Sequence, residues 1–310
     1  MKINPKIKAY AIIALIALLI PISINWFTFL AHFFSDGNDT PINPLEYKIL
    51  TDSTAAVSNC LLLETDTISI PEKTHIKGNE YTVTKIEKKA FSYCRRLTNI
   101  EIPESVTSIG SSAFKNCSNL TNIEIPESVT SINSSAFKNC SSLTNIEIPE
   151  SVTSIGSSAF ENCSSLTNII IPASVVISIG KSAFENCSSL TDIKIHANVT
   201  SIEEGTFNGC SQLSNVEIPA SITHIGNSAF QGCSSLRSIE IPENVTKIGD
   251  SAFRLCSSLK SIKIPASVIS IKKNAFVGCK NLDVVIDNSK DDVVVGEDAF
   301  RGCKSVRYTK

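Results

Sequence analysis

Cysteine is the residue type in this sequence whose pattern most suggests metal binding or redox chemistry, because ten of the eleven cysteines recur at a nearly fixed interval. A zinc site needs ligands that converge on one point, commonly supplied by C-x2–4-C pairs. These cysteines instead stand 23 residues apart, except for two intervals of 24, and only Cys60 falls outside the series. The spacing therefore predicts a row of thiols and no metal cluster. The series is Cys94, Cys117, Cys140, Cys163, Cys187, Cys210, Cys233, Cys256, Cys279 and Cys303.

Disulfides between neighbouring members of this row are the second chemistry to weigh. Chain segments about 5 Å apart bring Cα atoms within the range that a disulfide bridges. Side chains that run parallel to each other, however, keep their Cβ atoms too far apart. We therefore expect mostly free thiols that serve as a column of small buried apolar groups. An odd number of cysteines also cannot pair completely within one chain.

The other reactive side chains form no recognisable catalytic or metal-ligating pattern. The four histidines are scattered, with no two at metal-ligand spacing: His32, His75, His196 and His224. The chain lacks the G-x-S-x-G, H-E-x-x-H, G-x-x-x-x-G-K and G-x-G-x-x-G motifs. A formal net charge of −2 gives no electrostatic footprint for nucleic acid. We predict no catalytic residues, no cofactor site and no metal site, which disfavours an exported hydrolase.

The cysteines belong to a repeat of 23 residues, and this repeat sets the elements that carry the other side chains. Its pattern is L-x-x-I-x-I-P-x-S-V-T-S-I-G-x-x-A-F-x-N-C-x-x, and Leu120–Ser142 is one copy, with Asn133 in place of the glycine. Ile123 and Ile125 show the alternation of a half-buried strand, with the residue between them pointing outward. Pro126 then ends the strand's pairing, because proline has no backbone N–H to donate.

The second half of the repeat predicts a short extended segment followed by a turn. Val129 and Ile132 form a second inward-facing pair, and the segment that begins at Ala136–Phe137 is interpreted as one helical or 3-10 turn. The position before each cysteine holds Asn in some repeats and Gly in others, and both residues tolerate a positive φ angle. We therefore predict a left-handed conformation at this position, with Tyr93 and Leu255 as exceptions.

A single repeat cannot be stable, so the units must stack. One unit has too few large apolar side chains to offset the conformational entropy that is lost when its 23 residues are ordered. Stacking lets each strand pair with the next copy and seals a continuous apolar interior. The predicted fold is a solenoid made mainly of parallel strands about 4.8 Å apart, with columns of aliphatic, Phe and Cys side chains inside.

The repeat resembles a known family. L-x-x-I-x-I matches the strand signature of leucine-rich repeats, and the run I-G-x-x-A-F-x-x-C-x-x-L, as in Ile155–Leu166, is similar to the BspA-like class. The similarity covers roughly residues 67–310, with local departures at Val176, His196 and Asp287. It implies a curved leucine-rich-repeat solenoid, usually part of secreted or surface-attached proteins of bacteria and some protozoa, and often linked to adhesion or protein binding.

Residues 1–35 resemble an export signal. Lys2, Lys6 and Lys8 precede a stretch, residues 9–35, that has no charged side chain and is long enough to cross about 30 Å of hydrocarbon. We favour an uncleaved signal anchor, a single-pass transmembrane helix, over a removed signal peptide, because no A-x-A-like cleavage site is present. The lysines place the N-terminus in the cytoplasm and the repeats outside. A buried hairpin in a soluble protein is the remaining alternative.

The rest of the chain divides into a linker, a cap and the solenoid. Residues 36–45 are rich in Asp, Asn and Pro, which is typical of a linker. Residues 46–86 contain several β-like runs and are predicted to form a small N-terminal β cap that shields the first strand from promiscuous pairing. Residues 87–310 hold about ten repeats, and the polar last unit is predicted to be a C-terminal cap.

The outward strand positions supply a candidate partner-binding surface. The residue between the two strand isoleucines is Glu in the first three repeats and then Ile170 and Lys194, and another Glu follows each of the first three repeat prolines. Like charges about 5 Å apart cost energy unless water, cations or a basic partner offsets them. The alternative is that these residues are solvated and serve solubility. The surface comprises Glu101, Glu104, Glu124, Glu127, Glu147, Glu150, Ile170 and Lys194.

These observations predict a non-enzymatic leucine-rich-repeat protein that is displayed on the cell surface and binds a protein or another macromolecule, or mediates adhesion, through this outward face. A divalent cation is a further candidate ligand of the carboxylates. The alternative is a passive structural surface protein without a specific ligand. The near-identical outward residues of repeats one to three favour that alternative, because binding surfaces usually diversify.

Overall fold

The structure is a computed structural model that describes residues 44–61, 66–172, 178–196 and 198–310. The chain divides into two compact units, residues 1–43 and 44–310, and all described residues belong to the second unit. The predicted signal anchor of residues 1–35 therefore lies outside the described residues, as does nearly all of the predicted linker. Within the described part of the chain, no helix is long and apolar enough to cross a membrane.

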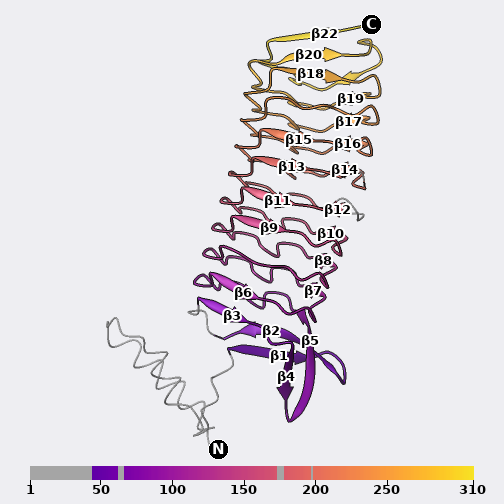
Figure 1. Cartoon of the computed structure of the whole chain (residues 1–310). Helices are drawn as coiled ribbons and strands as arrows, with labels where there is room; N and C mark the ends of the chain where they lie inside the picture. Colours follow the sequence, from indigo (N-terminus) through magenta and orange to yellow (C-terminus); the bar gives the residue numbers. More distant parts are fainter. Residues whose placement is uncertain (1–43, 62–65, 173–177, 197) are drawn as a thin grey trace, which may run out of the picture. The chain divides into compact units, whose positions relative to one another are not determined.

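Each repeat forms one turn of a parallel β-solenoid, which we call a rung, and this confirms the predicted stacking (Figure 1). The I-x-I segments lie on one face of the stack, the Ile-x-Ile face, and pair in parallel with the same column of the next rung, as Asn145 does with Asn168. This face is interrupted, because residues 122–124 and 238–240 form no strand and the strands at Asn168–Ile170 and Asp192–Lys194 belong to separate sheets. Its strands are β3 (Thr67–Ser69), β6 (Asn99–Glu101), β9 (Asn145–Glu147), β11 (Asn168–Ile170), β13 (Asp192–Lys194), β15 (Asn215–Glu217), β18 (Ser261–Ile264), β20 (Asp283–Ile286) and β22 (Ser305–Tyr308).

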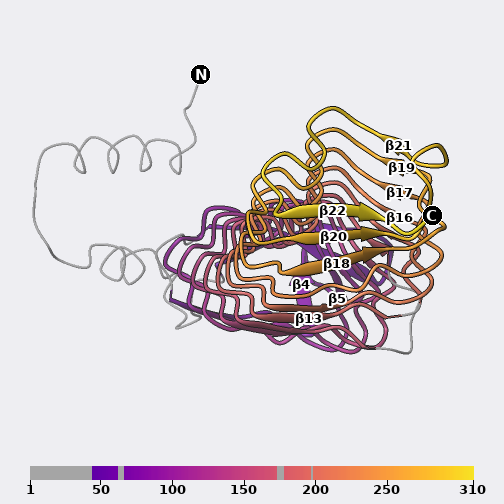
Figure 2. The ribbon, with the colours of Figure 1, turned by 90° about the horizontal axis from the view of Figure 1, so that it is seen from above.

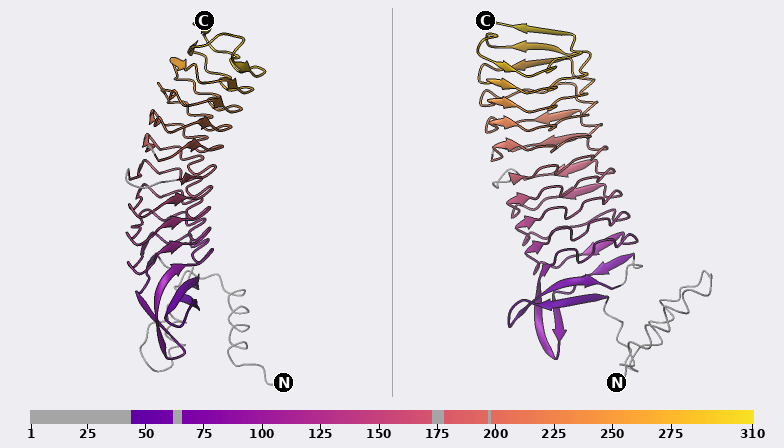
Figure 3. Two further views of the ribbon diagram at one scale, coloured as in Figure 1. Left: turned by 90° about the vertical axis from the view of Figure 1, so that its right-hand side faces the viewer. Right: turned by 180° about the vertical axis from the view of Figure 1, so that it is seen from behind.

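The S-I segments form a second parallel face, the Ser-Ile face, and again equivalent residues pair, as Ile155 does with Ile179. The two faces and the turns between them enclose the interior, which Figure 2 shows along the stack and Figure 3 from two sides. The strands of the Ser-Ile face are β5 (Asn79–Ile86), β7 (Ser108–Ile109), β8 (Ser131–Ile132), β10 (Ser154–Ile155), β12 (Ser178–Ile179), β14 (Ser201–Ile202), β16 (His224–Ile225), β17 (Lys247–Ile248), β19 (Ser270–Ile271) and β21 (Val294–Val295).

Three further strands lie at the N-terminal end of this unit: β1 (Leu45–Ile49), β2 (Thr54–Cys60) and β4 (Lys73–Ile76). β1 and β2 form an antiparallel hairpin, and β2 pairs in parallel with β5. β4 pairs with β5 in the antiparallel direction. The hairpin thus continues the Ser-Ile face beyond the first rung. At the other end, β21 and β22 each pair with only one described strand, and Val294, Val295 and Val306 are exposed there.

Phenylalanine fills the interior as one continuous column. Nine phenylalanines from Phe91 to Phe276 are completely buried, and the rings of successive rungs stack nearly parallel with centroids 5.2–5.7 Å apart, as far as Phe300. The strand isoleucines, such as Ile146 and Ile148, are buried beside this column. Offset-stacked rings attract each other in addition to their burial. The predicted inward columns of Ile and Phe are therefore confirmed.

The segment around each Phe is not helical, so the predicted helical or 3-10 turn is wrong. Its backbone N–H groups alternate between two kinds of acceptor. Those of Ala113, Lys115 and Cys117 bond within the rung, to carbonyls three residues earlier at 3.1–3.2 Å, whereas those of Phe114 and Asn116 bond to the next rung, both at 2.8 Å. A helix would direct every N–H along the same chain. Because the next rung accepts about half of these N–H groups, the segment forms a series of single hydrogen-bonded turns and no continuous helix.

This alternation coincides with two positive φ angles in every rung. The predicted position before the cysteine is left-handed in all ten rungs, and the expected exceptions were wrong because Tyr93 has φ 69° and Leu255 has φ 63°. A second left-handed position, two residues before each Phe, was not predicted. Serine occupies most of its copies: Lys89, Ser112, Ser135, Ser158, Ser182, Gly205, Ser228, Ser251, Asn274 and Asp298.

The cysteine column lies inside the stack and is composed of thiols. Each Sγ from Cys117 to Cys279 is buried and donates a hydrogen bond of 3.0–3.2 Å to the carbonyl oxygen of the Phe in the preceding rung. Burial disfavours the thiolate and raises the pKa of Cys163 to about 12. Cysteine therefore acts here as a small buried group whose one weak donor is satisfied.

We expect the substitution Leu255→Asn to stabilise the protein. Leu255 holds φ 63° with 48% of its surface exposed, and a non-glycine residue other than Asn or Asp pays about 1 kcal/mol in this conformation. Asparagine should recover much of that energy, visible as a higher urea midpoint of unfolding. Leu255→Ala is the control, because alanine removes the exposed side chain but keeps the strain. Equal midpoints for the two variants would contradict the explanation.

We also expect the buried thiols to be unreactive until the protein unfolds. At about pH 8, alkylation of the folded chain should spare Cys117 to Cys279 and start at Cys303, which is only partly buried. Because burial raises the pKa values of Cys163 and Cys210 to about 12, a moderate rise in pH should not speed the alkylation of these two thiols. Mass spectrometry after unfolding without reductant should find at least ten labelled cysteines. Two or fewer would show that the column forms disulfides instead.

Candidate binding surfaces

The predicted acidic residues occupy two positions of each rung: Glu101, Glu124 and Glu147 are in the outward column of the Ile-x-Ile face, and Glu104, Glu127 and Glu150 are in the turns after the prolines. Glu101 and Glu147 are the outward residues of β6 and β9, Glu124 occupies the same column between them, and all six glutamates are exposed. No ion pair between described residues involves any of them. We call this set the acidic patch: Glu101, Glu104, Glu124, Glu127, Glu147 and Glu150.

The other two predicted residues continue the same column. Ile170 lies directly across from Glu147 in the β9–β11 pair and is 51% exposed, which is unusual for isoleucine. Lys194 lies across from Glu217 in the β13–β15 pair, and its Nζ is 3.2 Å from the Glu217 carboxylate. Lys263 similarly pairs with Asp287 of the next rung. Lys194 and Lys263 in the later rungs are therefore offset by acidic neighbours, whereas the glutamates of the acidic patch have no such partner among the described residues.

The described residues provide no obvious metal centre. No group of three or more His, Cys, Asp or Glu side chains in this part of the chain is arranged to hold a metal ion. His75 lies in β4 and His224 in β16, so the structure does not bring these two histidines together. A divalent cation at the acidic patch stays a prediction, and it would rely on pairs of carboxylates from successive rungs.

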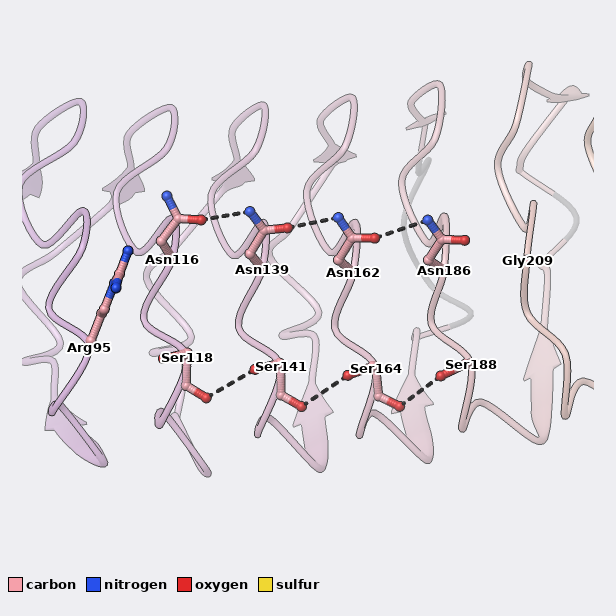
Figure 4. A pocket seen from close by; sticks show the side chains of 10 residues that line it. All are labelled: Arg95, Asn116, Ser118, Asn139, Ser141, Asn162, Ser164, Asn186, Ser188 and Gly209. Atoms are coloured by element: carbon pink, nitrogen blue, oxygen red, sulfur yellow. Dashed lines mark hydrogen bonds between the residues drawn. The ribbon is translucent and has the colours of Figure 1, made fainter.

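A second surface, which the sequence analysis missed, is a polar groove along the turns that precede the Ile-x-Ile face (Figure 4). Its volume is about 630 Å³. One wall is a column of asparagines from four successive rungs, and the other is a column of serines. We call it the Asn–Ser groove, and its lining residues are Arg95, Asn116, Ser118, Asn139, Ser141, Asn162, Ser164, Asn186, Ser188 and Gly209.

The asparagine side chains form a hydrogen-bonded ladder. Nδ2 of Asn139, Asn162 and Asn186 each donates to Oδ1 of the asparagine in the preceding rung, at 2.6, 2.7 and 2.9 Å. The serine hydroxyls of the opposite wall donate to the backbone carbonyl one rung earlier at 3.3–3.4 Å. Carboxamides can stack in this way because each has both a donor and an acceptor. The sequence feature that could have predicted this ladder is the recurrence of N-C-S in four successive repeats.

The ladder ends where glycine replaces asparagine. Gly209 has φ +75°, and a Cβ atom there would overlap Oδ1 of Asn186. In the next rung Gly232 has the same φ, but the nearest atoms to its Cβ position belong to Gly209 and are 3.7 Å away. Both glycines satisfy the left-handed backbone, and only Gly209 also makes room for a side chain of the ladder.

This difference predicts unequal effects of the same substitution. Gly232→Ala should lower the free energy of unfolding by about 1 kcal/mol through its positive φ. Gly209→Ala should lower it by roughly 1 kcal/mol more, because the Asn186 carboxamide must leave its hydrogen bond to Asn162. Urea unfolding of the two variants provides the comparison. Equal losses would mean that the end of the ladder contributes nothing to stability.

Comparison with known proteins identifies the repeat. The family model described as "BspA type Leucine rich repeat region (6 copies)" matches residues 64–188 and 177–307. A leucine-rich repeat protein from Bacteroides ovatus is 30% identical over 87% of this chain and 81% of its own, with a TM-score of 0.61. The leucine-rich repeat protein TpLRR of T. pallidum is also 30% identical, over 64% of this chain and 91% of its own, with a TM-score of 0.57.

A more distant structure shares the fold alone. The pneumococcal vaccine antigen PcpA is 22% identical over 86% of this chain and 80% of its own, with a TM-score of 0.60. A search among curated proteins found no match.

Proposed function

Because the chain belongs to the BspA-type leucine-rich repeat family, we propose that it is a non-enzymatic protein that binds other proteins while displayed outside the cytoplasm. Two features support the location. Residues 9–35 carry no charge and follow three lysines, as an export signal does. Members of the family are commonly secreted or attached to a cell surface.

The observation that carries the binding role is the acidic patch. Six exposed carboxylates on three successive rungs have no ion-pair partner among the described residues, whereas Lys194 and Lys263 in later rungs do. A potential of one sign on a stiff surface speeds encounter with a basic partner and selects against acidic ones. Ile170 at the border of the patch adds exposed apolar surface, which contributes binding energy that salt does not screen.

The proposed partner is thus a protein with a basic surface beside an apolar side chain. Solenoids suit such contacts, because stacked units give an extended surface that moves little on binding. The absence of a reactive constellation in the sequence supports a role without catalysis.

A charge-reversal experiment tests this proposal. The purified full chain is screened against an array of extracellular and cell-surface proteins of known charge, and binders are measured by surface plasmon resonance. The double variant Glu124→Lys with Glu147→Lys should weaken binding at least about tenfold, since each exposed charge contact is worth up to about 1 kcal/mol. The loss should shrink as salt is added.

Glu240→Lys is the matched control, because Glu240 is exposed in the same column but lies outside the acidic patch. It should change the affinity less than twofold. If no arrayed protein binds, or if the double variant binds as well as the original chain, the candidate that remains is a passive structural surface protein. The near-identity of the outward residues in the first three repeats is the observation that favours it.

A further inference from the structure

The Asn–Ser groove has chemistry that protein binding through the acidic patch does not use. Asn139 and Asn162 each use one N–H and one oxygen lone pair on their neighbours in the ladder, which leaves a second N–H and a second lone pair for a ligand. At its ends, Asn116 only accepts and Asn186 only donates. The serine hydroxyls donate to the backbone, so their oxygens still have lone pairs to accept with. Most of these side chains are half-buried, and the groove is open to solvent. The Asn–Ser groove therefore presents a row of fixed, neutral hydrogen-bonding groups.

An exposed aromatic ring stands at the start of this row. Tyr93 occupies the ladder position in the rung before Asn116, and 53% of its surface is exposed. The guanidinium of Arg95, which lines the same end of the groove, lies 6.0 Å from the centre of the Tyr93 ring. Hydroxyl-rich rings such as sugars have polar edges that suit carboxamides and apolar faces that stack on aromatic rings. The carboxamides of the groove and the Tyr93 ring, which lies beside the lining residue Arg95, offer both kinds of contact.

The interval between rungs distinguishes the polymers that can follow this row. Successive Phe rings inside these rungs are 5.2–5.6 Å apart, and paired parallel strands lie about 4.8 Å apart, so the groove repeats at roughly 5 Å. An extended peptide advances about 3.3 Å per residue, so its groups fall out of step with the rungs after one or two residues. A pyranose ring linked across C1 and C4 is about as long as one rung, so a linear glycan can place one ring at each rung. Successive rings of a β-1,4-linked chain are turned by about half a rotation, so the same hydroxyls face the carboxamides at every second rung.

The charge of the groove further restricts the class of polymer that can bind there. Its walls are neutral, and Arg95 is the single ionic side chain that lines it. One cation at the end of the groove does not make the basic stripe that a nucleic acid or a highly sulfated chain requires. We propose that the Asn–Ser groove binds a linear, neutral polysaccharide of β-linked pyranose units, one ring per rung, with a terminal ring stacked on Tyr93.

A glycan titration with the full chain tests this site. The probes are cellohexaose and chitohexaose, and binding is followed by isothermal titration calorimetry. Tyr93→Asn removes the stacking ring but keeps a residue that tolerates the left-handed backbone, so folding is preserved while affinity falls about fivefold. Asn139→Gly also tolerates this backbone and interrupts the ladder, and it should weaken binding by a similar factor.

Two controls separate this site from folding and from the acidic patch. Leu255→Asn makes an equivalent change at the same repeat position outside the groove, and it should leave glycan affinity unchanged. The double variant Glu124→Lys with Glu147→Lys should also bind glycan normally, so failure of the proposed protein binding would not affect this result. The proposal is overturned if neither hexasaccharide binds, if Tyr93→Asn and Asn139→Gly bind as the original chain does, or if an extended neutral peptide competes equally well.

Discussion

The structure depends on backbone hydrogen bonds that every second residue of the turn segment donates to the next rung. Phe114 and Asn116 donate to the following rung, while Ala113 and Lys115 donate within their own. This alternation requires the backbone to reverse its handedness twice, which is why each rung has two positive φ angles. It also directs every Phe inward at the same height, so the rings stack. The Phe carbonyl that faces the next rung then receives the cysteine thiol as a donor.

The parts of this arrangement that could be predicted are those that one repeat encodes by itself. Ile123 and Ile125 alternate with polar residues, and Phe137 and Cys140 recur with fixed offsets, so inward columns follow from the period and from hydrophobicity. Asparagine and glycine before the cysteine indicate a left-handed backbone for the same local reason. The outward position of Glu101, Glu124 and Glu147 also follows from strand alternation.

The parts that could not be predicted depend on the neighbouring rung. The turn at Ala136–Phe137 was expected to be helical because the sequence does not show that half its N–H groups find acceptors elsewhere. Tyr93 and Leu255 take positive φ although neither residue favours it, because their neighbours in the stack impose the backbone. Serine at the second left-handed position gives no local signal. The Asn–Ser groove was missed because asparagine was assigned only a backbone role, whereas its side chain bonds to the adjacent rung.

A solenoid of near-identical rungs places each side chain next to another of its own type, and this rule decides which columns can be uniform. Phe, Ser and Asn columns are self-compatible: rings stack, hydroxyls reach the preceding carbonyl, and carboxamides donate and accept. Glutamate has two acceptors and no donor, so a uniform column is repulsive. The column that contains Lys138 and Glu161 changes sign between these two rungs, and the two charges form an ion pair 2.6 Å apart. In the acidic patch no ion pair between described residues offsets this repulsion. A cationic partner that binds there removes the repulsion, so its binding releases more free energy than binding to a neutral surface would.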